Sequence, residues 1–198
     1  VGASTPILFA GLGELVAEKS GVLNLGVEGM MLIGAIAAFA TVDQLGNPWL
    51  AVVAAAAAGA AVSMIFAVLT LSLSANQVAT GLALTIFGTG LSTLIGNNFT
   101  GRAIKTFEPL FPAALASNPI GRVVFGYSPL VYFSFIMVAL VAWFLRGTRA
   151  GLILRAVGEN DLSAHSIGYS VTGVRYAAVA FGGAMAGIGG ATFPLVLT

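Results

Sequence analysis

The chain has 198 residues, of which 58% are hydrophobic and 8% are Asp, Glu, Lys or Arg; its net charge is +1 and it contains no cysteine. A soluble domain carries roughly 25% charged residues, so this composition excludes a water-soluble globular protein. It also excludes disulfides and Cys-ligated metal centres, and the few basic residues form no patch for nucleic acid. We therefore expect a multi-pass protein of the cell membrane.

Six apolar segments are candidates for crossing the bilayer, which takes about 20 helical residues. No Asp, Glu, Lys or Arg occurs in 44–101, in 123–145 or after Arg175. Residues 130–145 are apolar all round, without the alternation of a β-barrel strand, so we predict an all-α fold. The predicted spans are, in order, 2–17, 28–43, 49–73, 76–96, 129–146 and 172–196.

The first two spans differ from the rest because they are short and carry charge. The stretch from Leu12 to Met31 holds the polar residues Glu14, Glu18, Lys19, Asn24 and Glu28. A carboxylate at membrane depth costs at least roughly 2.5 kcal/mol, so such groups normally face a cavity or a partner. Glycines between the two spans allow a break between half-helices, a device that exposes backbone groups to a transported solute. The alternative is an interfacial loop around Glu18 and Lys19, with the acids solvated or paired to Lys19.

Amide side chains mark the start of the fourth span, at Asn76 and Gln77. Amides donate and accept hydrogen bonds without net charge, which suits a neutral solute rich in hydroxyl or amide groups. They are equally suited to capping a helix. With these alternatives open, the predicted solute pathway comprises Asn24, Glu28, Asn76 and Gln77.

Small residues recur at a spacing of four in the fourth and sixth spans. Gly183 and Gly187 form a GxxxG pair that Gly190 extends, and a similar ridge runs through 88–96. Such ridges let helix backbones approach closely in lipid. We predict that Gly183, Gly187 and Gly190 serve helix packing, although a chain with 26 glycines also shows such spacings by chance.

A polar passage, residues 147–171, separates the fifth and sixth spans. Asn160 suits an N-cap, Asp161 complements the positive end of a helix dipole, and Gly168 suits the position after a helix. We therefore predict a short helix from Asp161 to Ile167. A helix of about two turns is unstable alone in water, so it must dock on its own protein or on a partner. The apolar residues available for docking are Leu162, Ala164 and Ile167.

The distribution of basic residues predicts which side of the membrane this passage occupies. If it is cytoplasmic, alternation of the spans places five basic residues inside and three outside, the sign expected from the positive-inside rule. The inside residues are Lys19, Arg146, Arg149, Arg155 and Arg175. The outside residues are Arg102, Lys105 and Arg122.

The sequence lacks the motifs of nucleotide hydrolysis and hydrolase chemistry, including GxxxxGK[ST], HExxH and GxSxG. Its only histidine, His165, has no second ligand at metal-binding spacing. We therefore expect no enzymatic activity, bound cofactor or metal. Energy for any transport must come from an ion gradient or from ATP on another subunit.

Three separated passages resemble one family of membrane proteins. GLILRAVGENDLSAHSIGYSVTGVRYAAVAFGGAMAGIGGA, residues 151–191, resembles the cytoplasmic coupling loop of ABC importer permeases of the branched-chain amino acid, ribose and simple-sugar superfamily. EKSGVLNLGVEGMMLIGA (18–35) and ANQVATGLAL (75–84) resemble its nucleoside and simple-sugar branch. One departure is Asp161, because members often carry proline after the asparagine that precedes the coupling segment.

The resemblance implies a single transmembrane permease domain over 1–198, which we expect to be truncated at both ends, with 147–171 as its cytoplasmic coupling loop. The coupling helix would sit in a groove of a separate ATPase and transmit its movement, and we call this helix the lever. Gly158 and Gly168 would define the lever, and Arg155 and Glu159 would position it. The implied coupling residues are Arg155, Gly158, Glu159, Asn160, Asp161, Leu162, Ala164, Ile167 and Gly168.

The resemblance also implies partners and a transported solute. The expected partners are an ATP-binding subunit, a second permease subunit that is the same or homologous, an extracytoplasmic solute-binding lipoprotein and membrane lipids. The expected cargo is a nucleoside or a simple-sugar-like solute. Two alternatives stay open, namely an ion-coupled secondary transporter acting through Glu14 or Glu28, and a membrane scaffold subunit without a pathway.

Overall fold

A computed structural model describes residues 2–99, 101, 104, 106–107 and 126–196 of the chain. Within these residues the regular structure is entirely helical. The elements are η1 (Gly2–Ser4), α1 (Thr5–Lys19), α2 (Val27–Leu45), α3 (Pro48–Ala67), the π-helical turn η2 (Val68–Ser72), α4 (Gln77–Gly96), η3 (Asn97–Phe99), α6 (Pro129–Gly147), α7 (Arg149–Glu159), α8 (Asp161–Ser166) and α9 (Val171–Val196).

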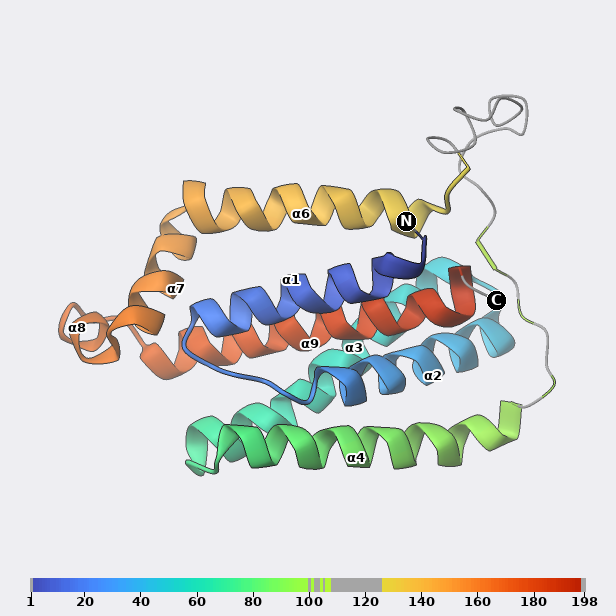
Figure 1. Cartoon of the computed structure of the whole chain (residues 1–198), viewed down its shortest axis with the longest axis horizontal. Helices are drawn as coiled ribbons and strands as arrows, with labels where there is room; N and C mark the ends of the chain where they lie inside the picture. The colour runs from blue at the N-terminus through green and yellow to red at the C-terminus, as the bar shows by residue number, and fades with distance from the viewer. Residues whose placement is uncertain (1, 100, 102–103, 105, 108–125, 197–198) are drawn as a thin grey trace.

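Five helical stretches among the described residues are long and apolar enough to cross a membrane: Val27–Leu45, Pro48–Ser72, Gln77–Phe99, Pro129–Gly147 and Val171–Val196. The all-α, multi-pass prediction is therefore confirmed. The first of the six predicted spans is the helix α1, which has 15 residues. At 1.5 Å per residue it is about 22 Å long, shorter than the roughly 30 Å hydrocarbon core. It nevertheless lies inside the bundle beside α9 (Figure 1).

The helix ends follow local sequence signals. Gly46, at a φ of +65°, ends α2, and Asn47 then begins α3 by accepting a hydrogen bond from the Trp49 backbone N–H at 3.0 Å. Asn76 caps α4 in the same way, accepting from the Ala79 N–H at 3.0 Å. Each cap satisfies an amide that would otherwise lack a partner at the start of a helix.

Helix α9 is the centre of the bundle, and α1, α2 and α3 pack around it. Its glycines make this approach possible. A Cβ added at Gly187 would overlap the carbonyl oxygen of Ala55 in α3, and one at Gly190 would overlap the carbonyl oxygen of Met31 in α2. Gly183 lies against the side chain of Ser63 in α3. Gly187 and Gly190 therefore occupy contacts where two backbones meet directly, and Gly183 makes room for the Ser63 side chain.

The helix α4 lies on the outer side of α2, while α6 packs against α1 at the opposite edge of the bundle (Figure 1). The end of α1, the turn into α4 and the pair α7 and α8 lie at one end of the molecule. That end carries the basic residues predicted to be inside, Lys19, Arg146, Arg149, Arg155 and Arg175. The residues predicted to be outside, Arg102, Lys105 and Arg122, are not among the described residues.

Candidate functional site

The connection between α6 and α9 contains two helices, of which the sequence analysis predicted only the second. Thr148 caps α7 by accepting a hydrogen bond from the Gly151 N–H at 3.0 Å. Gly151, Leu154 and Val157 are buried. Their spacing of three places them on one face of the helix, and this period together with the Thr148 cap was the available signal for α7.

The predicted short helix is present as α8. Asn160 has extended backbone, and its side chain accepts a hydrogen bond from the Ser163 N–H at 3.0 Å, so it is the predicted N-cap. The helix ends at Ser166, one residue earlier than predicted. Gly168 follows at a φ of +95°, a left-handed conformation that favours glycine, and its N–H donates to the His165 carbonyl at 2.9 Å.

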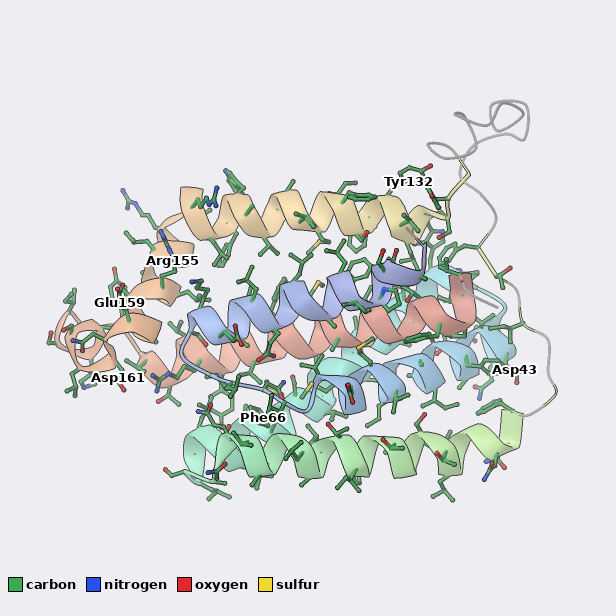
Figure 2. All side chains as sticks on the ribbon, in the orientation of Figure 1. Asp43, Phe66, Tyr132, Arg155, Glu159 and Asp161 are labelled. Atoms are coloured by element: carbon green, nitrogen blue, oxygen red, sulfur yellow. The ribbon has the colours of Figure 1, made fainter. Side chains whose placement is uncertain are left out.

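The three apolar residues of this lever face different ways. Ala164 is buried against the chain itself, whereas Leu162 is 80% exposed and Ile167 is 74% exposed. The remaining predicted coupling residues are exposed as well, and Figure 2 shows three of them at this end of the molecule. They are Arg155, Gly158, Glu159, Asn160, Asp161 and Gly168. Leu162 in α8 and Ile167 directly after it therefore place two large apolar side chains on the surface at this end of the bundle.

Gly158, which was predicted to help define the lever, lies inside α7, one residue before the helix ends. The chain changes direction at Asn160. The absence of a side chain at Gly158 also serves a contact, since a Cβ there would overlap the carbonyl oxygen of Lys19 at the end of α1. The α7 backbone thus rests directly on the end of α1.

The chain between α1 and α2 is not helical, as the glycines and polar residues of this stretch predicted. Within this segment, Asn24 is 2% exposed. The Asn24 backbone N–H donates to Glu14 Oε1 at 2.9 Å, and Asn24 Oδ1 accepts from the Gly26 N–H at 3.0 Å. Glu14 Oε2 is buried and has no hydrogen-bond partner among the described residues. The Asn24 side chain therefore shapes the turn, while Glu14 keeps a free acceptor beside it.

Helix α4 holds the same segment from the other side. Gln77 Oε1 accepts from the Leu23 N–H at 2.8 Å, and Thr85 Oγ1 donates to the Leu25 carbonyl at 3.1 Å. Asn76 is exposed and occupied as the cap of α4. We refer to residues 20–26 as the re-entrant segment, because the chain turns back from the end of α1 into the bundle there, where it contacts α1 and α4 before α2 begins (Figure 1).

The four predicted pathway residues are thus only partly brought together. Asn24 belongs to the re-entrant segment and Gln77 binds it, Asn76 directly precedes Gln77 at the start of α4, and Glu28 is exposed on the first turn of α2. A polar stripe on α4 was not predicted. It consists of Thr85, Thr89 and Thr93, whose spacing of four places them on one helix face.

A cavity of about 540 Å³ lies between α6, α7 and α9. Its lining is almost wholly apolar and includes Met137, Trp143, Leu154 and Phe181. A hydroxyl-rich solute would lose its hydrogen bonds to water there without replacement. This cavity is therefore unsuited to a sugar or a nucleoside, in contrast to the polar surroundings of the re-entrant segment.

A multi-pass helical bundle with a short, capped helix at one end defines an integral membrane protein. The chain belongs to the family of branched-chain amino acid transport system permease components, whose sequence profile matches residues 1–198. Members of this family are permease components rather than enzymes, in agreement with the lack of a nucleotide-hydrolysis motif.

Individual relatives support the same assignment. The chain is 40% identical over its whole length to a putative glucose ABC transporter permease protein of Haloferax volcanii. It is 35% identical, over 96% of its length, to a nucleoside ABC transporter permease protein of Lactococcus lactis, and 34% identical, again over 96%, to a guanosine ABC transporter permease protein of Bacillus subtilis. The chain spans 62% of the length of the first relative and 64% of the other two. No solved structure matches it.

Proposed function

We propose that the chain forms the membrane-spanning core of a permease subunit of an ABC importer that moves a nucleoside or a simple sugar into the cell. The observation that carries this proposal is the projection of Leu162 and Ile167 from α8 at the basic end of the bundle. Two large, highly exposed apolar side chains close together at the end of the bundle favour a protein partner that covers them, because their burial removes apolar surface from water. An ATP-binding subunit is that partner, and it supplies the ATP hydrolysis for which this chain has no motif.

The coupling surface extends beyond these two side chains. Arg155 and Glu159 are one helical turn apart and exposed near the end of α7, so they frame the entry to α8 with opposite charges. Ala164 anchors α8 on the chain itself. The groove of the ATP-binding subunit would therefore receive Leu162 and Ile167, while the charges of Arg155 and Glu159 set the orientation of the lever.

The solute pathway runs beside the re-entrant segment, and Asn24, Glu28, Asn76 and Gln77 belong to it. Exposed Glu28 and the hydroxyls of Thr89 and Thr93 offer hydrogen bonds to a neutral, hydroxyl-rich molecule. The two hydroxyls donate to carbonyls of their own helix, at 2.8 Å each, and stay available as acceptors. The exposed Glu28 carboxylate is the group that needs a partner or water rather than lipid. A second permease subunit, the same or homologous, would close the pathway over this face.

The relatives support the choice of solute and of partners. They are named for transport of glucose, of nucleosides and of guanosine, all of which carry a sugar ring with several hydroxyls. An extracytoplasmic solute-binding lipoprotein would deliver the solute to the end of the bundle opposite α8. Selectivity then depends mainly on that lipoprotein, so weak polar contacts along the pathway are sufficient.

The proposal is tested by reconstituting the full-length permease with its ATP-binding and solute-binding subunits in proteoliposomes. Uptake of labelled guanosine and labelled glucose is measured with ATP on the α8 side, with and without ionophores that collapse proton and sodium gradients. We expect uptake of at least one solute to require ATP and to continue with ionophores present. Uptake that stops with the ion gradient while ATP is constant would overturn the proposal in favour of ion coupling through Glu14 or Glu28.

A further inference from the structure

The turn at the end of α1, residues 19–21, lies between the two helices that flank α8. Helix α7, which precedes α8, contacts the turn through Gly158, and helix α9, which follows α8, contacts it through Arg175. We propose that Arg175 is a positioning residue that transmits the movement of α8 to the re-entrant segment. This inference rests on the proposed function and assigns the route by which the lever reaches the pathway.

The Arg175 guanidinium bridges α8 and the turn. Its Nε donates to the carbonyl oxygen of Ser20 at 3.1 Å, and its Nη2 lies 3.6 Å from Asp161 Oδ2. Ser20 is fully buried, so its carbonyl has little access to water as a substitute donor. Asp161 is the first residue of α8. A displacement of the start of α8 is thereby coupled, through one planar and rigid group, to the backbone of the turn.

The turn packs closely against α7 and Arg175. Gly21 has a φ of +85°, and a Cβ there would lie 3.3 Å from Arg175 Nη2 and 3.4 Å from the Gly158 Cα. Ser20 Oγ and the Ser20 N–H both bond to the Ala17 carbonyl, at 2.7 and 3.0 Å. The turn is thus tied to α1 on one side and confined by α7 and α9 on the others.

From the turn, the path into the bundle is short. Val22 is 1% exposed, the Leu23 N–H donates to Gln77, and the Asn24 N–H donates to Glu14. A shift at Ser20 therefore strains hydrogen bonds to both α1 and α4 within four residues. These are the helices beside which the proposed pathway runs, so the same shift alters the width and polarity of its α8 end.

The test uses the full importer assembly with two variants. Arg175→Gln removes the charge. Arg175→Lys keeps the charge but removes the guanidinium, whose Nε and Nη2 reach Ser20 and Asp161. The readouts are the binding of the ATP-binding subunit, its hydrolysis rate and the amount of solute moved per ATP. We expect binding and hydrolysis to persist while solute moved per ATP falls roughly tenfold for Arg175→Gln, within the usual range of coupling between sites. Arg175→Lys should retain only part of the wild-type amount of solute moved per ATP. Arg149→Gln, an exposed arginine at the same end, is the matched control and should behave as wild type.

A second readout separates transmission from a merely structural effect. Because the chain has no native cysteine, spin labels can be attached at Ser163→Cys in α8 and, separately, at Leu25→Cys in the re-entrant segment. In wild type, both spectra should change when ATP is added. With Arg175→Gln, the α8 change should remain and the Leu25 change should be lost. A Leu25 response that survives Arg175→Gln overturns this inference alone, whereas a wild-type assembly without any ATP-dependent change at α8 overturns the proposed function as well.

Discussion

Replacing Gly187 with alanine is expected to destabilise the bundle severely, although it adds only one methyl group. The new Cβ would overlap the Ala55 carbonyl oxygen in α3, and both groups belong to helix backbones that cannot move independently. Overpacking a core by small groups typically costs 1–3 kcal/mol, and forcing two central helices apart places this case at about 3 kcal/mol. For a chain of this size that corresponds to a fall in Tm on the order of 10 °C, measured by thermal unfolding in detergent.

Gly90 provides the matched control for Gly187, because it is a helical glycine of α4 with nothing near the position of an added Cβ. Gly90→Ala should leave the Tm unchanged or raise it slightly, since alanine has a helix propensity about 1 kcal/mol more favourable than glycine. Equal Tm values for the two variants would contradict the assignment of α9 as the packing centre. Gly187→Leu should abolish the folded monomer peak in gel filtration.

Replacing Leu162 with aspartate is expected to detach the ATP-binding subunit without unfolding the bundle. Leu162 is 80% exposed, so no core contact is lost, but a charge would enter the apolar groove of the partner. Large effects at interface hot spots are about 2 kcal/mol or more, which corresponds to a roughly 30-fold weaker Kd. The measurement is the affinity of the detergent-solubilised permease for its ATP-binding subunit, together with solute uptake.

The control for Leu162→Asp is Ser163→Asp, which adds the same charge to the neighbouring residue. There the carboxylate lies in the first turn of α8, where it interacts favourably with the helix dipole. This variant should bind the ATP-binding subunit nearly as well as wild type. If both aspartates weaken binding equally, the effect is one of net charge, and Leu162 is not an anchor.

The fold was largely predictable because hydrophobic runs and helix caps are local signals. Asn160 and Asp161 sufficed to predict α8, and the charge-free runs located four of the five long spans. The fifth, α2, carries Glu28 and Asp43 near its two ends. The charged residues in the first predicted span distinguished it from the apolar spans, and α1, with 15 residues, is shorter than the five long spans. These features depend on residues within a few positions of one another, so a single sequence contains them.

The site was less predictable because its contacts join residues far apart in the chain. Arg175 was counted only as a basic residue, yet it binds Ser20, 155 positions away. Asn24 was predicted to belong to the pathway from its residue type, but the sequence did not indicate that its buried side chain also organises a turn. Gly158 was predicted to help define the lever, but the sequence did not indicate that it also allows α7 to contact the end of α1. Composition and spacing specify which residues are unusual, and only packing specifies what each one touches.

The central claim is that α8 lies on the cytoplasmic side and that the turn between α2 and α3 lies on the opposite side. Single cysteines at Ser163 and at Asn47, introduced separately into this cysteine-free chain, test it directly with a membrane-impermeant maleimide. In intact cells we expect labelling at Asn47→Cys and none at Ser163→Cys, and the reverse in inside-out vesicles. Labelling of Ser163→Cys from outside intact cells would contradict the account, because a cytoplasmic ATPase could not then reach α8.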